Sequence, residues 1–256
     1  MFQVTRKEEI IKILSKSRES KISDLCDTFN VSLATIHRDL NELAREGRIK
    51  KVHGGVLLNV YEKAENPFSS RIKINAELKK KVARKALEFV KNDDCLFMDN
   101  STTCYYFAKE LSESNFMNMI IITNSNSIPD LFLGKNNIQV VSTGGLLNKE
   151  FNCFVGPTAI KAVNEFNADK FFLSSAAISM DGEFGDIFFP ESDEVKQNMY
   201  RRSKESICIL DSSKFNKIAP RVNFKISEID KIITDNGCSK VILERFKKMG
   251  KELIIA

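Results

Sequence analysis

A stretch rich in polar and basic side chains lies between positions 32 and 53 and carries the first groups that could bind a ligand. Ser32 is predicted to be a helix N-cap, because its hydroxyl can accept a hydrogen bond from a free amide of the first turn. Ile36, Leu40 and Leu43 then recur at helical spacing and form one apolar face. The opposite face carries Ala34, Arg38, Asn41 and Arg45, with Thr35 and His37 on its flanks. Small, amide and guanidinium groups suit phosphates and base edges, so this helix is predicted to bind in a major groove of DNA.

The residues around this helix complete a winged helix-turn-helix. Two preceding helices are expected to bury residues at helical spacing, namely Ile10, Ile11 and Leu14 in the first and Ile22, Leu25, Cys26 and Phe29 in the second. Gly47 is expected to end the recognition helix. The basic wing that follows, with Gly54 and Gly55 at its turn, is predicted to contact backbone phosphate through Arg48, Lys50, Lys51 and His53. The pattern also fits an ordinary three-helix bundle with a solvated polar face, because short helical triplets are common.

The sequence of this segment resembles that of the DeoR-type bacterial transcriptional regulators. The match runs through Ser32-x-x-Thr35-Ile36-His37-Arg38-Asp39-Leu40, then Glu46-Gly47 and His53-Gly54-Gly55. His37 stands where the family usually has arginine, and a histidine donates hydrogen bonds differently from a guanidinium fork. Asp39 is acidic in a segment that faces DNA, so we expect it to hold a basic side chain or a backbone amide.

Composition places the chain among folded proteins with more than one domain. It has 256 residues, 43% of them hydrophobic and 29% charged, and a net charge of +5, of which residues 1–60 carry +3. No apolar run reaches membrane-spanning length and no signal pattern opens the chain, which predicts a cytoplasmic protein without a membrane partner. The six cysteines are scattered and are expected to be reduced core thiols. Both histidines lie in the DNA-binding segment, and nothing in the pattern predicts a metal site or a cofactor.

The chain divides by pattern into residues 1–58, an α+β winged helix-turn-helix, residues 59–73, a linker, and residues 74–256, an α/β domain. Short apolar runs that alternate with helices predict a mostly parallel sheet covered by helices on both faces. The expected strands are 95–98, 119–123, 138–141, 170–173, 206–210, 231–234 and 252–255. The expected helices include 74–90, one ending at Leu111, and 128–133, 156–166, 192–203 and 240–249. Lys79, Lys80 and Lys81 are expected on the solvated side of the first of these helices.

Four loops follow predicted strands and could bind a ligand, because open α/β sheets place ligands at the carboxyl ends of their strands. They carry Asp99, Ser101, Thr102 and Thr103; then Thr123 and Asn124; then Gly144 and Gly145; and finally Lys214 in Asp211-Ser-Ser-Lys214. Hydroxyls and free amides at a helix N-terminus form an anion cradle. Each loop also has a simpler interpretation: a helix cap, a turn residue or a surface lysine.

The same landmarks, together with Val155-Gly156 and Glu194-Val-Lys196, resemble the DeoR-type sensor domain. That resemblance implies a fold similar to ribose-5-phosphate isomerase and a phosphorylated sugar or related effector. It also implies that Ser101, Thr102 and Thr103 hold the phosphate, that Lys214 holds a phosphate or hydroxyl, and that Asp99 and Asn124 hold sugar hydroxyls. The family usually has a glycine-rich turn ending in Gly-Ile-Asp after the fourth strand, whereas this chain has Ser174-Ser-Ala-Ala-Ile-Ser179. Side chains in that loop are expected to narrow the pocket or alter its ligand.

These features favour a ligand-responsive transcriptional repressor of a carbohydrate operon, which binds operator DNA as a homo-oligomer. An activator would have the same sequence features. A sugar-phosphate isomerase fused to a DNA-binding module is an alternative, with Asp181, Glu183 and Asp186 as the remaining acids near the altered loop. An architectural or RNA-binding protein is a third, but it would not need four loops of this kind. The main prediction is therefore a regulator and not an enzyme.

Overall fold

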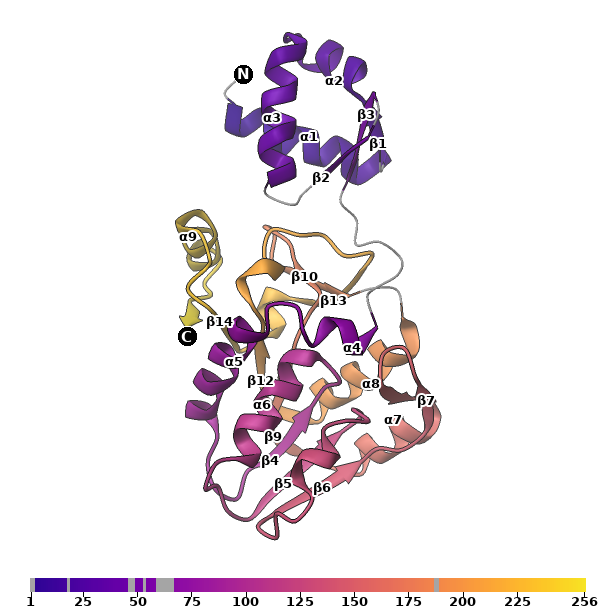
Figure 1. Cartoon of the computed structure of the whole chain (residues 1–256), viewed down its shortest axis with the longest axis vertical. Helices are drawn as coiled ribbons and strands as arrows, with labels where there is room; N and C mark the ends of the chain where they lie inside the picture. Colours follow the sequence, from indigo (N-terminus) through magenta and orange to yellow (C-terminus); the bar gives the residue numbers. More distant parts are fainter. Residues whose placement is uncertain (1–2, 18, 46–48, 53, 59–66, 187–188) are drawn as a thin grey trace.

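The computed structural model describes residues 3–17, 19–45, 49–52, 54–58, 67–186 and 189–256 (Figure 1). Its N-terminal part contains α1 (Gln3–Ser17), β1 (Glu19–Lys21), α2 (Ile22–Phe29), α3 (Leu33–Arg45), β2 (Ile49–Val52) and β3 (Gly55–Leu58). The three strands form an antiparallel sheet in the order β1-β3-β2. The helices and this sheet surround one apolar core, which includes Ile10, Leu14, Leu25, Ile36, Leu40, Leu43 and Val56. The predicted winged helix-turn-helix is confirmed.

The local signals act as expected around α3, the helix that the sequence predicts to bind DNA. The amide of Thr35 donates to Ser32 Oγ over 3.3 Å, so Ser32 caps the helix. Asn30 ends α2 in the left-handed region, with φ of 49°, which gives the short turn between the two helices. Gly54 has φ of 73° at the tip of the wing, a conformation that glycine adopts without strain. Gly47 lies outside the described residues.

The C-terminal part is built on a seven-stranded sheet in the order β15-β14-β12-β9-β4-β5-β6, and every neighbouring pair is parallel. The strands are β4 (Cys95–Met98), β5 (Met119–Thr123), β6 (Ile138–Ser142), β9 (Ala168–Leu173), β12 (Ser203–Ile209), β14 (Lys231–Thr234) and β15 (Leu253–Ile255). All seven were expected from their apolar runs. The predicted α/β fold with a mostly parallel sheet is confirmed.

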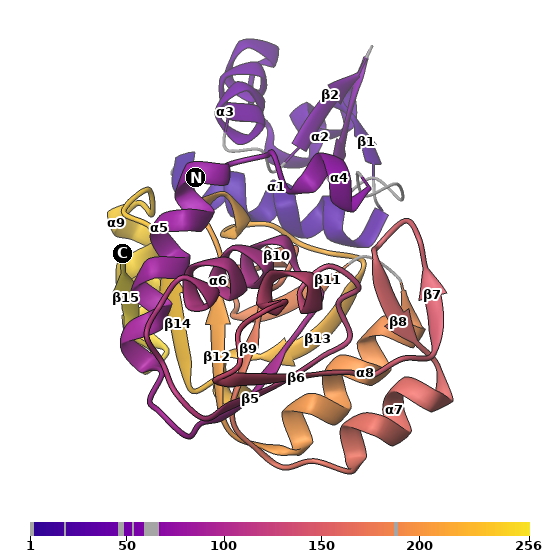
Figure 2. The same ribbon diagram turned by 60° about the horizontal axis from the view of Figure 1, so that its bottom comes forward.

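Helices cover both faces of this sheet (Figure 2). One face packs on α5 (Ala76–Ala86) and α6 (Thr102–Ser112). The other packs on α7 (Pro157–Asn164), α8 (Pro190–Arg201) and α9 (Lys240–Lys248). Successive strand residues enter opposite cores, since Leu96 and Met98 join the first and Phe97 the second. Burial on both sides explains why the strands are continuous apolar runs.

Two small sheets were not predicted. β10 (Ala177–Ile178), β11 (Glu183–Asp186) and β13 (Arg221–Lys225) form an antiparallel sheet. β7 (Leu146–Asn148) and β8 (Cys153–Val155) form a hairpin. These strands are short, so neither length nor alternation marks them in the sequence. The helix expected at 128–133 is only a 3₁₀ turn, Pro129–Phe132.

The predicted linker and the lysine run also differ from expectation. Part of residues 59–73 is a helix, α4 (Phe68–Arg71), while 59–66 lie outside the described residues. Phe68 is buried, and its ring meets that of Tyr105 in α6 edge to face at 5.9 Å. Lys79 is 3% exposed instead of solvated, because its Nζ donates to the carbonyl of Arg71 over 2.6 Å. The segment from α4 into α5 is therefore packed onto the C-terminal part.

Candidate functional site

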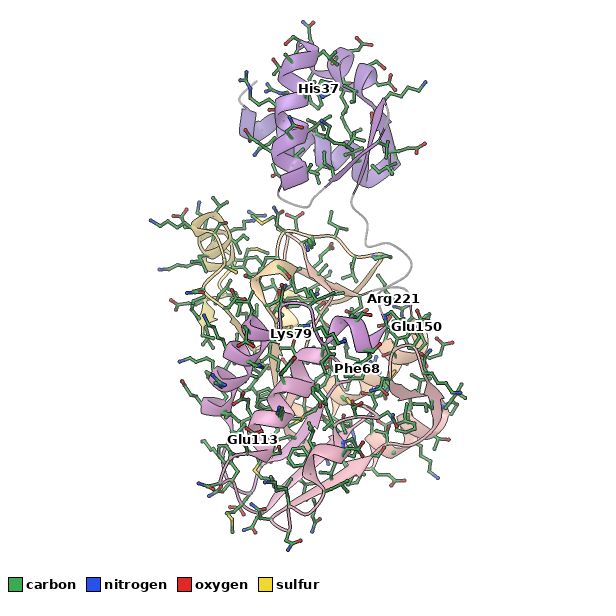
Figure 3. The ribbon with its side chains drawn as sticks, viewed as in Figure 1. His37, Phe68, Lys79, Glu113, Glu150 and Arg221 are labelled. Carbon is green, nitrogen blue, oxygen red and sulfur yellow. The ribbon has the colours of Figure 1, made fainter. Side chains whose placement is uncertain are left out.

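The recognition helix presents the predicted polar face to solvent. Ala34, Arg38 and Asn41 are exposed, as is Ser32 at the cap, while Thr35 and His37 (Figure 3) are half-buried. Lys51 of β2 is exposed and donates through Nζ to Asn41 Oδ1 over 2.8 Å, and the same Nζ lies 3.5 Å from His37 Nδ1. Lys51 of the wing thus lies directly against the exposed face of α3. Arg48 and His53 lie outside the described residues, as do the side chains of Arg45 and Lys50.

Asp39 lies on the buried side of the same helix, away from its exposed polar face. It is fully buried, and Arg6 Nε of α1 donates to its Oδ2 over 2.6 Å. The pair joins α1 to α3 through a charge-assisted hydrogen bond, which is stronger than a neutral one. The expectation that Asp39 holds a basic side chain is confirmed.

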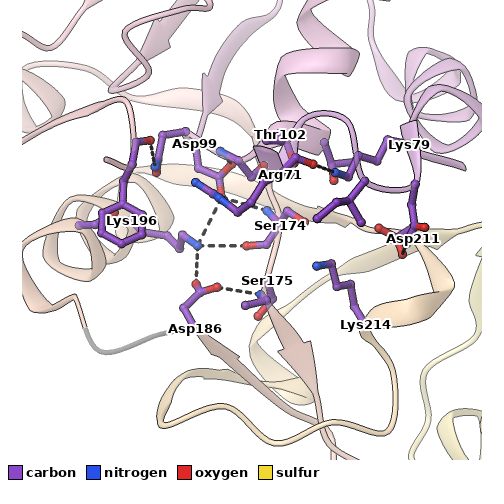
Figure 4. Close-up of a pocket in the computed structure, with 18 of the residues that line it drawn as sticks. Arg71, Lys79, Asp99, Thr102, Ser174, Ser175, Asp186, Lys196, Asp211 and Lys214 are labelled. Carbon is purple, nitrogen blue, oxygen red and sulfur yellow. Dashed lines mark hydrogen bonds and ion pairs between the residues drawn. The ribbon is translucent and has the colours of Figure 1, made fainter. Parts of the chain in front are cut away.

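A cavity of about 540 Å³ lies at the carboxyl ends of β4, β9 and β12 (Figure 4). Residues that directly follow three adjacent strands line the cavity: Asp99 follows β4, Ser174 follows β9, and Asp211 follows β12. Five of the nine predicted effector residues line it, namely Asp99, Ser101, Thr102, Thr103 and Lys214. The position agrees with the general placement of ligands in open α/β sheets.

The first turn of α6 forms one side of the cavity. Ser101 is the N-cap, and its Oγ accepts from the amide of Cys104 over 3.1 Å. Asp99 Oδ1 accepts from the amide of Ser101 over 2.9 Å, which fixes the entry to the helix. Thr102 and Thr103 follow at the first helical positions and line the same cavity. Unsatisfied amides and the positive end of the helix dipole make such a turn suitable for an anion.

Four cationic side chains line the cavity besides Lys196: Arg71, Lys79, Lys214 and Lys217. Burial lowers the pKa of Lys217, and the neighbouring charge of Lys214 lowers it further, partly opposed by Asp211. A bound anion near these two lysines would reduce their repulsion. The lining therefore combines hydroxyls, a helix N-terminus and positive charge, which together match a phosphate group.

Lys196 of α8 organises the acidic side of the cavity. Its Nζ donates to Asp186 Oδ2 over 2.7 Å and to the Ser174 carbonyl over 3.0 Å, and it lies 3.4 Å from Asp99 Oδ2 (Figure 4). Burial alone would lower the pKa of the Lys196 ammonium, but the two carboxylates outweigh burial and raise it above its ordinary value. Lys196 is therefore charged, and its ammonium group holds Asp99, Asp186 and the Ser174 carbonyl together on one side of the cavity.

The two carboxylates beside Lys196 are also bound to the backbone of the altered loop. The amide of Ser174 donates to Asp99 Oδ2 over 2.9 Å, and that of Ala176 donates to Asp186 Oδ1 over 2.7 Å. Asn223 Nδ2 adds a hydrogen bond to Asp186 Oδ2 over 2.8 Å. A general base for isomerisation must reach the substrate's C–H bond. Here both carboxylates are occupied in holding the loop, an arrangement that does not favour the isomerase alternative. Of its other two acids, Asp181 is exposed and pairs with Arg245, and Glu183 is exposed.

Asp193 is expected to make the stability of the protein depend on pH. Burial raises its pKa to about 6; Lys196 and Arg221 oppose this effect, and Asp186 reinforces it. Between about pH 4 and pH 6 the folded chain then holds a proton that the unfolded chain has lost. The free energy of unfolding should therefore fall as pH rises through this window, by about 1–2 kcal/mol.

Urea unfolding of the wild type and Asp193→Asn at pH 4.5, 5.5 and 6.5 measures this contribution. Asparagine keeps an oxygen to accept from Asn223 Nδ2, which donates to Asp193 Oδ1 over 3.0 Å in the wild type. The wild type should lose stability relative to the variant as pH rises. If the stabilities of the two proteins vary in parallel with pH, the proposed titration of Asp193 is wrong.

The other four predicted effector residues, Thr123, Asn124, Gly144 and Gly145, do not line this cavity; Thr123 joins β5 to β4, and Asn124 joins the sheet to the β7–β8 hairpin. Thr123 Oγ1 donates to the Met98 carbonyl over 2.8 Å, and Asn124 Nδ2 donates to the Phe154 carbonyl over 3.3 Å. Gly144 and Gly145 form a turn with φ of 59° and 110°. A Cβ at Gly145 would lie 2.7 Å from the Val155 carbonyl oxygen, so the close approach of the hairpin requires glycine there. Their strands, β5 and β6, are at the end of the sheet away from β12.

Several cavity residues were missed as site residues. Arg71 lies in the predicted linker, and Asn75 lies just after it. Lys79 is predicted to lie on the solvated side of a helix, but it lines the cavity. Phe151 and Phe189 stack with their ring centres 4.8 Å apart at the rim. The sequence marks Asp186 as an acid near the altered loop and Lys196 as part of the family resemblance. It does not indicate that these two side chains meet. Phe68 directly after Pro67 was the one local signal that the linker ends in a packed helix.

The cysteines are free thiols, three of them buried: Cys104, Cys153 and Cys208. Burial raises the pKa of the Cys153 thiol to about 12, so it stays protonated at neutral pH. In the part of the chain that the structure describes, no helix is both long and apolar enough to cross a membrane.

Comparison with known proteins places both parts of the chain in one family. The family model of the DeoR-like helix-turn-helix domain matches residues 6–61, and that of the DeoR C-terminal sensor domain matches residues 74–236. The chain is 32% identical over 241 residues to the HTH-type transcriptional regulator YulB of Bacillus subtilis, covering 93% of this chain and 90% of that one. It is 29% identical over 235 residues to the L-fucose operon activator of Escherichia coli, covering 91% and 95%.

Among solved structures, ribose 5-phosphate isomerase A from Neisseria gonorrhoeae is similar, with a TM-score of 0.40 and 21% identity. The match covers 54% of this chain and 53% of that one. The two domain matches and the full-length relatives agree with the winged helix and the cavity-bearing α/β domain described above. The chain belongs to the DeoR family of HTH-type transcriptional regulators.

Proposed function

We propose that this regulator binds operator DNA through α3 and the wing, and a phosphorylated sugar or sugar alcohol in the cavity of its C-terminal domain. The observation that carries the effector class is the meeting of the α6 N-terminus with Arg71, Lys79, Lys214 and Lys217 in one cavity. The phosphate would lie at Ser101, Thr102 and Thr103, with Lys214 near it. The hydroxyls of the effector would meet the side of the cavity that carries Asp99 and Asp186.

The DNA surface is proposed to consist of the exposed face of α3 and the wing. Its members are Ser32, Ala34, Thr35, His37, Arg38, Asn41, Arg45, Arg48, Lys50, Lys51 and His53. The domain boundaries are proposed as 1–58, 59–66 and 67–256, since α4 packs against α6. A homo-oligomer would present two such helices to half-sites separated by whole turns of DNA.

The sign of regulation is proposed to be repression, with effector binding shifting the oligomer away from its DNA-bound arrangement. Such coupling requires the effector to bind the two arrangements with different affinity. The wild-type protein should release its operator when the phosphorylated effector is added, whereas an activator would hold or gain DNA contact.

A thermal-shift screen tests the effector class. Phosphorylated sugars and sugar alcohols are compared, each with its unphosphorylated form, on the wild type, Thr102→Ala and Lys214→Ala. A ligand at about 100 times its dissociation constant adds about 2.7 kcal/mol of stability, which raises Tm by roughly 5–10 °C in a domain of this size. We expect a shift with a phosphorylated compound alone, reduced in both variants. Lys161→Ala in α7, which removes an exposed lysine outside the cavity, is the matched control.

A shift of equal size with an unphosphorylated sugar would overturn the phosphate assignment. A phosphate-specific shift that both cavity variants retain would place the effector elsewhere in the protein.

A further inference from the structure

One wall of the cavity belongs to the segment that leads from the DNA-binding domain. Residues 67–79 contain α4, the following turn and the start of α5, and they contribute Arg71, Ile74, Asn75 and Lys79 to the lining. In sequence this segment directly follows residues 59–66. A ligand in the cavity therefore contacts the first packed segment after the DNA-binding domain.

This segment is held at its start by contacts with α6 and with the turn before β8. The amide of Phe68 donates to the Glu150 carbonyl over 3.1 Å, and both residues are labelled in Figure 3. The buried Phe68 ring packs against Tyr105, and Tyr106 Oη donates to the Ile72 carbonyl over 3.0 Å. Tyr105 and Tyr106 belong to α6, and the residues at the start of this helix, Ser101–Thr103, also line the cavity.

The end of the segment is held by the loop after β12. Asn75 has φ of 53°, and its Nδ2 donates over 3.0 Å to Asp211 Oδ1 and to Ser213 Oγ. Asp211 and Ser213 line the cavity beside Lys214. The segment thus contacts α6, whose first turn is assigned to the phosphate, and the loop that carries Lys214.

Arg71 is the cation that this segment places in the cavity. Its guanidinium carbon lies 6.0 Å from the centre of the Phe68 ring and 5.9 Å from that of Phe151. Its carbonyl is bound by Lys79 Nζ. Two aromatic faces and a tethered backbone orient the side chain within the lining (Figure 4). A guanidinium presents a planar fork of donors that matches phosphate better than an ammonium does.

We propose that Arg71 binds the anionic group of the effector, and that residues 67–79 are thereby the element through which cavity occupancy reaches the DNA-binding domain. The inference rests on the proposed function, because it requires an anion at the α6 N-terminus. The anion bridges that turn and Arg71, so it stabilises one position of the segment over others. Coupling between two sites needs such a differential contact.

Hydrogen exchange on the full chain, with inorganic phosphate as the probe and chloride at equal ionic strength as the reference, tests the proposal. Phosphate should slow exchange in two peptides, one from residues 68–79 and one from the start of α6. For amides that exchange only from the free form, the slowing is about threefold at a phosphate concentration of about twice the dissociation constant.

Three variants sharpen the test. Arg71→Ala should lose the protection of residues 68–79 and keep part of that at α6. Arg71→Lys keeps the charge without the fork and should give an intermediate effect, which also controls for a general loss of packing. Arg84→Ala removes an exposed arginine of α5 that pairs with Glu110 outside the cavity, and it should behave as the wild type.

The outcomes separate the two claims. Protection at α6 without protection at residues 68–79 would overturn the role of Arg71 and leave the phosphate site in place. If residues 68–79 are protected by phosphate as strongly in Arg71→Ala as in the wild type, the role of Arg71 is likewise wrong, while the phosphate site remains. No protection in either peptide of the wild type would overturn the phosphate site itself, and the role of Arg71 with it.

Discussion

Replacing Lys196 with methionine is expected to lower the free energy of unfolding of the protein by about 3–5 kcal/mol. The Lys196 side chain is 10% exposed, and it lies between the carboxylates of Asp99 and Asp186, whose side chains are 2% and 19% exposed. Methionine has a similar length but carries no charge, so the two carboxylates would remain close together without a neutralising cation. Urea unfolding followed by circular dichroism measures the loss.

Two further variants show whether the loss comes from unpaired charge. Lys204→Met breaks a pair of similar length, 2.7 Å to Asp169, but that lysine side chain is 76% exposed. Exposed pairs contribute about 0–1 kcal/mol, so this control should change little. The double variant Lys196→Met, Asp186→Asn removes one of the two carboxylates and should recover part of the loss. If Asp186→Asn lowers the free energy of unfolding as much in Lys196→Met as it does in the wild type, the electrostatic explanation fails.

Replacing Arg38 with alanine is expected to reduce specific DNA binding at least roughly 30-fold, because a dimer would lose one contact in each half-site. Each bidentate contact between arginine and a base contributes about 1–3 kcal/mol of discrimination. Arg38 is exposed, whereas the residues that hold α3 in the core, such as Ile36 and Leu40, are fully buried. The substitution should therefore leave the fold and its Tm unchanged.

The measurement uses DNA that the wild-type protein selects from a random-sequence library, at one fixed salt concentration, because phosphate contacts make affinity depend on salt. Fluorescence anisotropy compares the selected DNA with a scrambled duplex for each variant. Arg84→Ala, with the same change in net charge but in the C-terminal domain, should bind as the wild type does. An Arg38→Ala protein that keeps its preference for the selected DNA would show that Arg38 does not read bases.

Much of the fold follows from local patterns that a single sequence contains. Ser32 caps α3 because a hydroxyl can bond the free amides of any helix start, and Ile36, Leu40 and Leu43 share a face because of the helical repeat. The seven strands of the large sheet are continuous apolar runs because both of their faces are buried. The short strands of the two small sheets carry no such signal, since runs of two to five residues show neither a clear alternation nor a long apolar stretch, and β11 also pairs with β13 about 38 residues away in the chain.

The cavity was only partly predictable for a related reason. Ser101, Thr102 and Lys214 follow apolar strands, and the general rule for α/β sheets marks them as ligand residues. The same rule marks Thr123 and Gly145 equally well. The rule cannot distinguish the residues that line the cavity from Thr123 and Gly145, which do not, because it contains no information on which strands are neighbours.

Local sequence patterns are enough to predict the two kinds of domain, helix α3, the strands of the large sheet and the loops that end them. The packing of the whole chain places β4, β9 and β12 side by side, with β6 at the edge, and it brings Gly145 against the Val155 carbonyl of the hairpin. The same packing brings Lys196 to Asp99 and Asp186, and it brings into the cavity Arg71 from an expected linker and Lys79 from a helix side expected to be solvated. Capping and periodicity act over a few neighbouring residues, whereas strand order and ion pairs across 10 to 97 residues depend on how the whole chain packs.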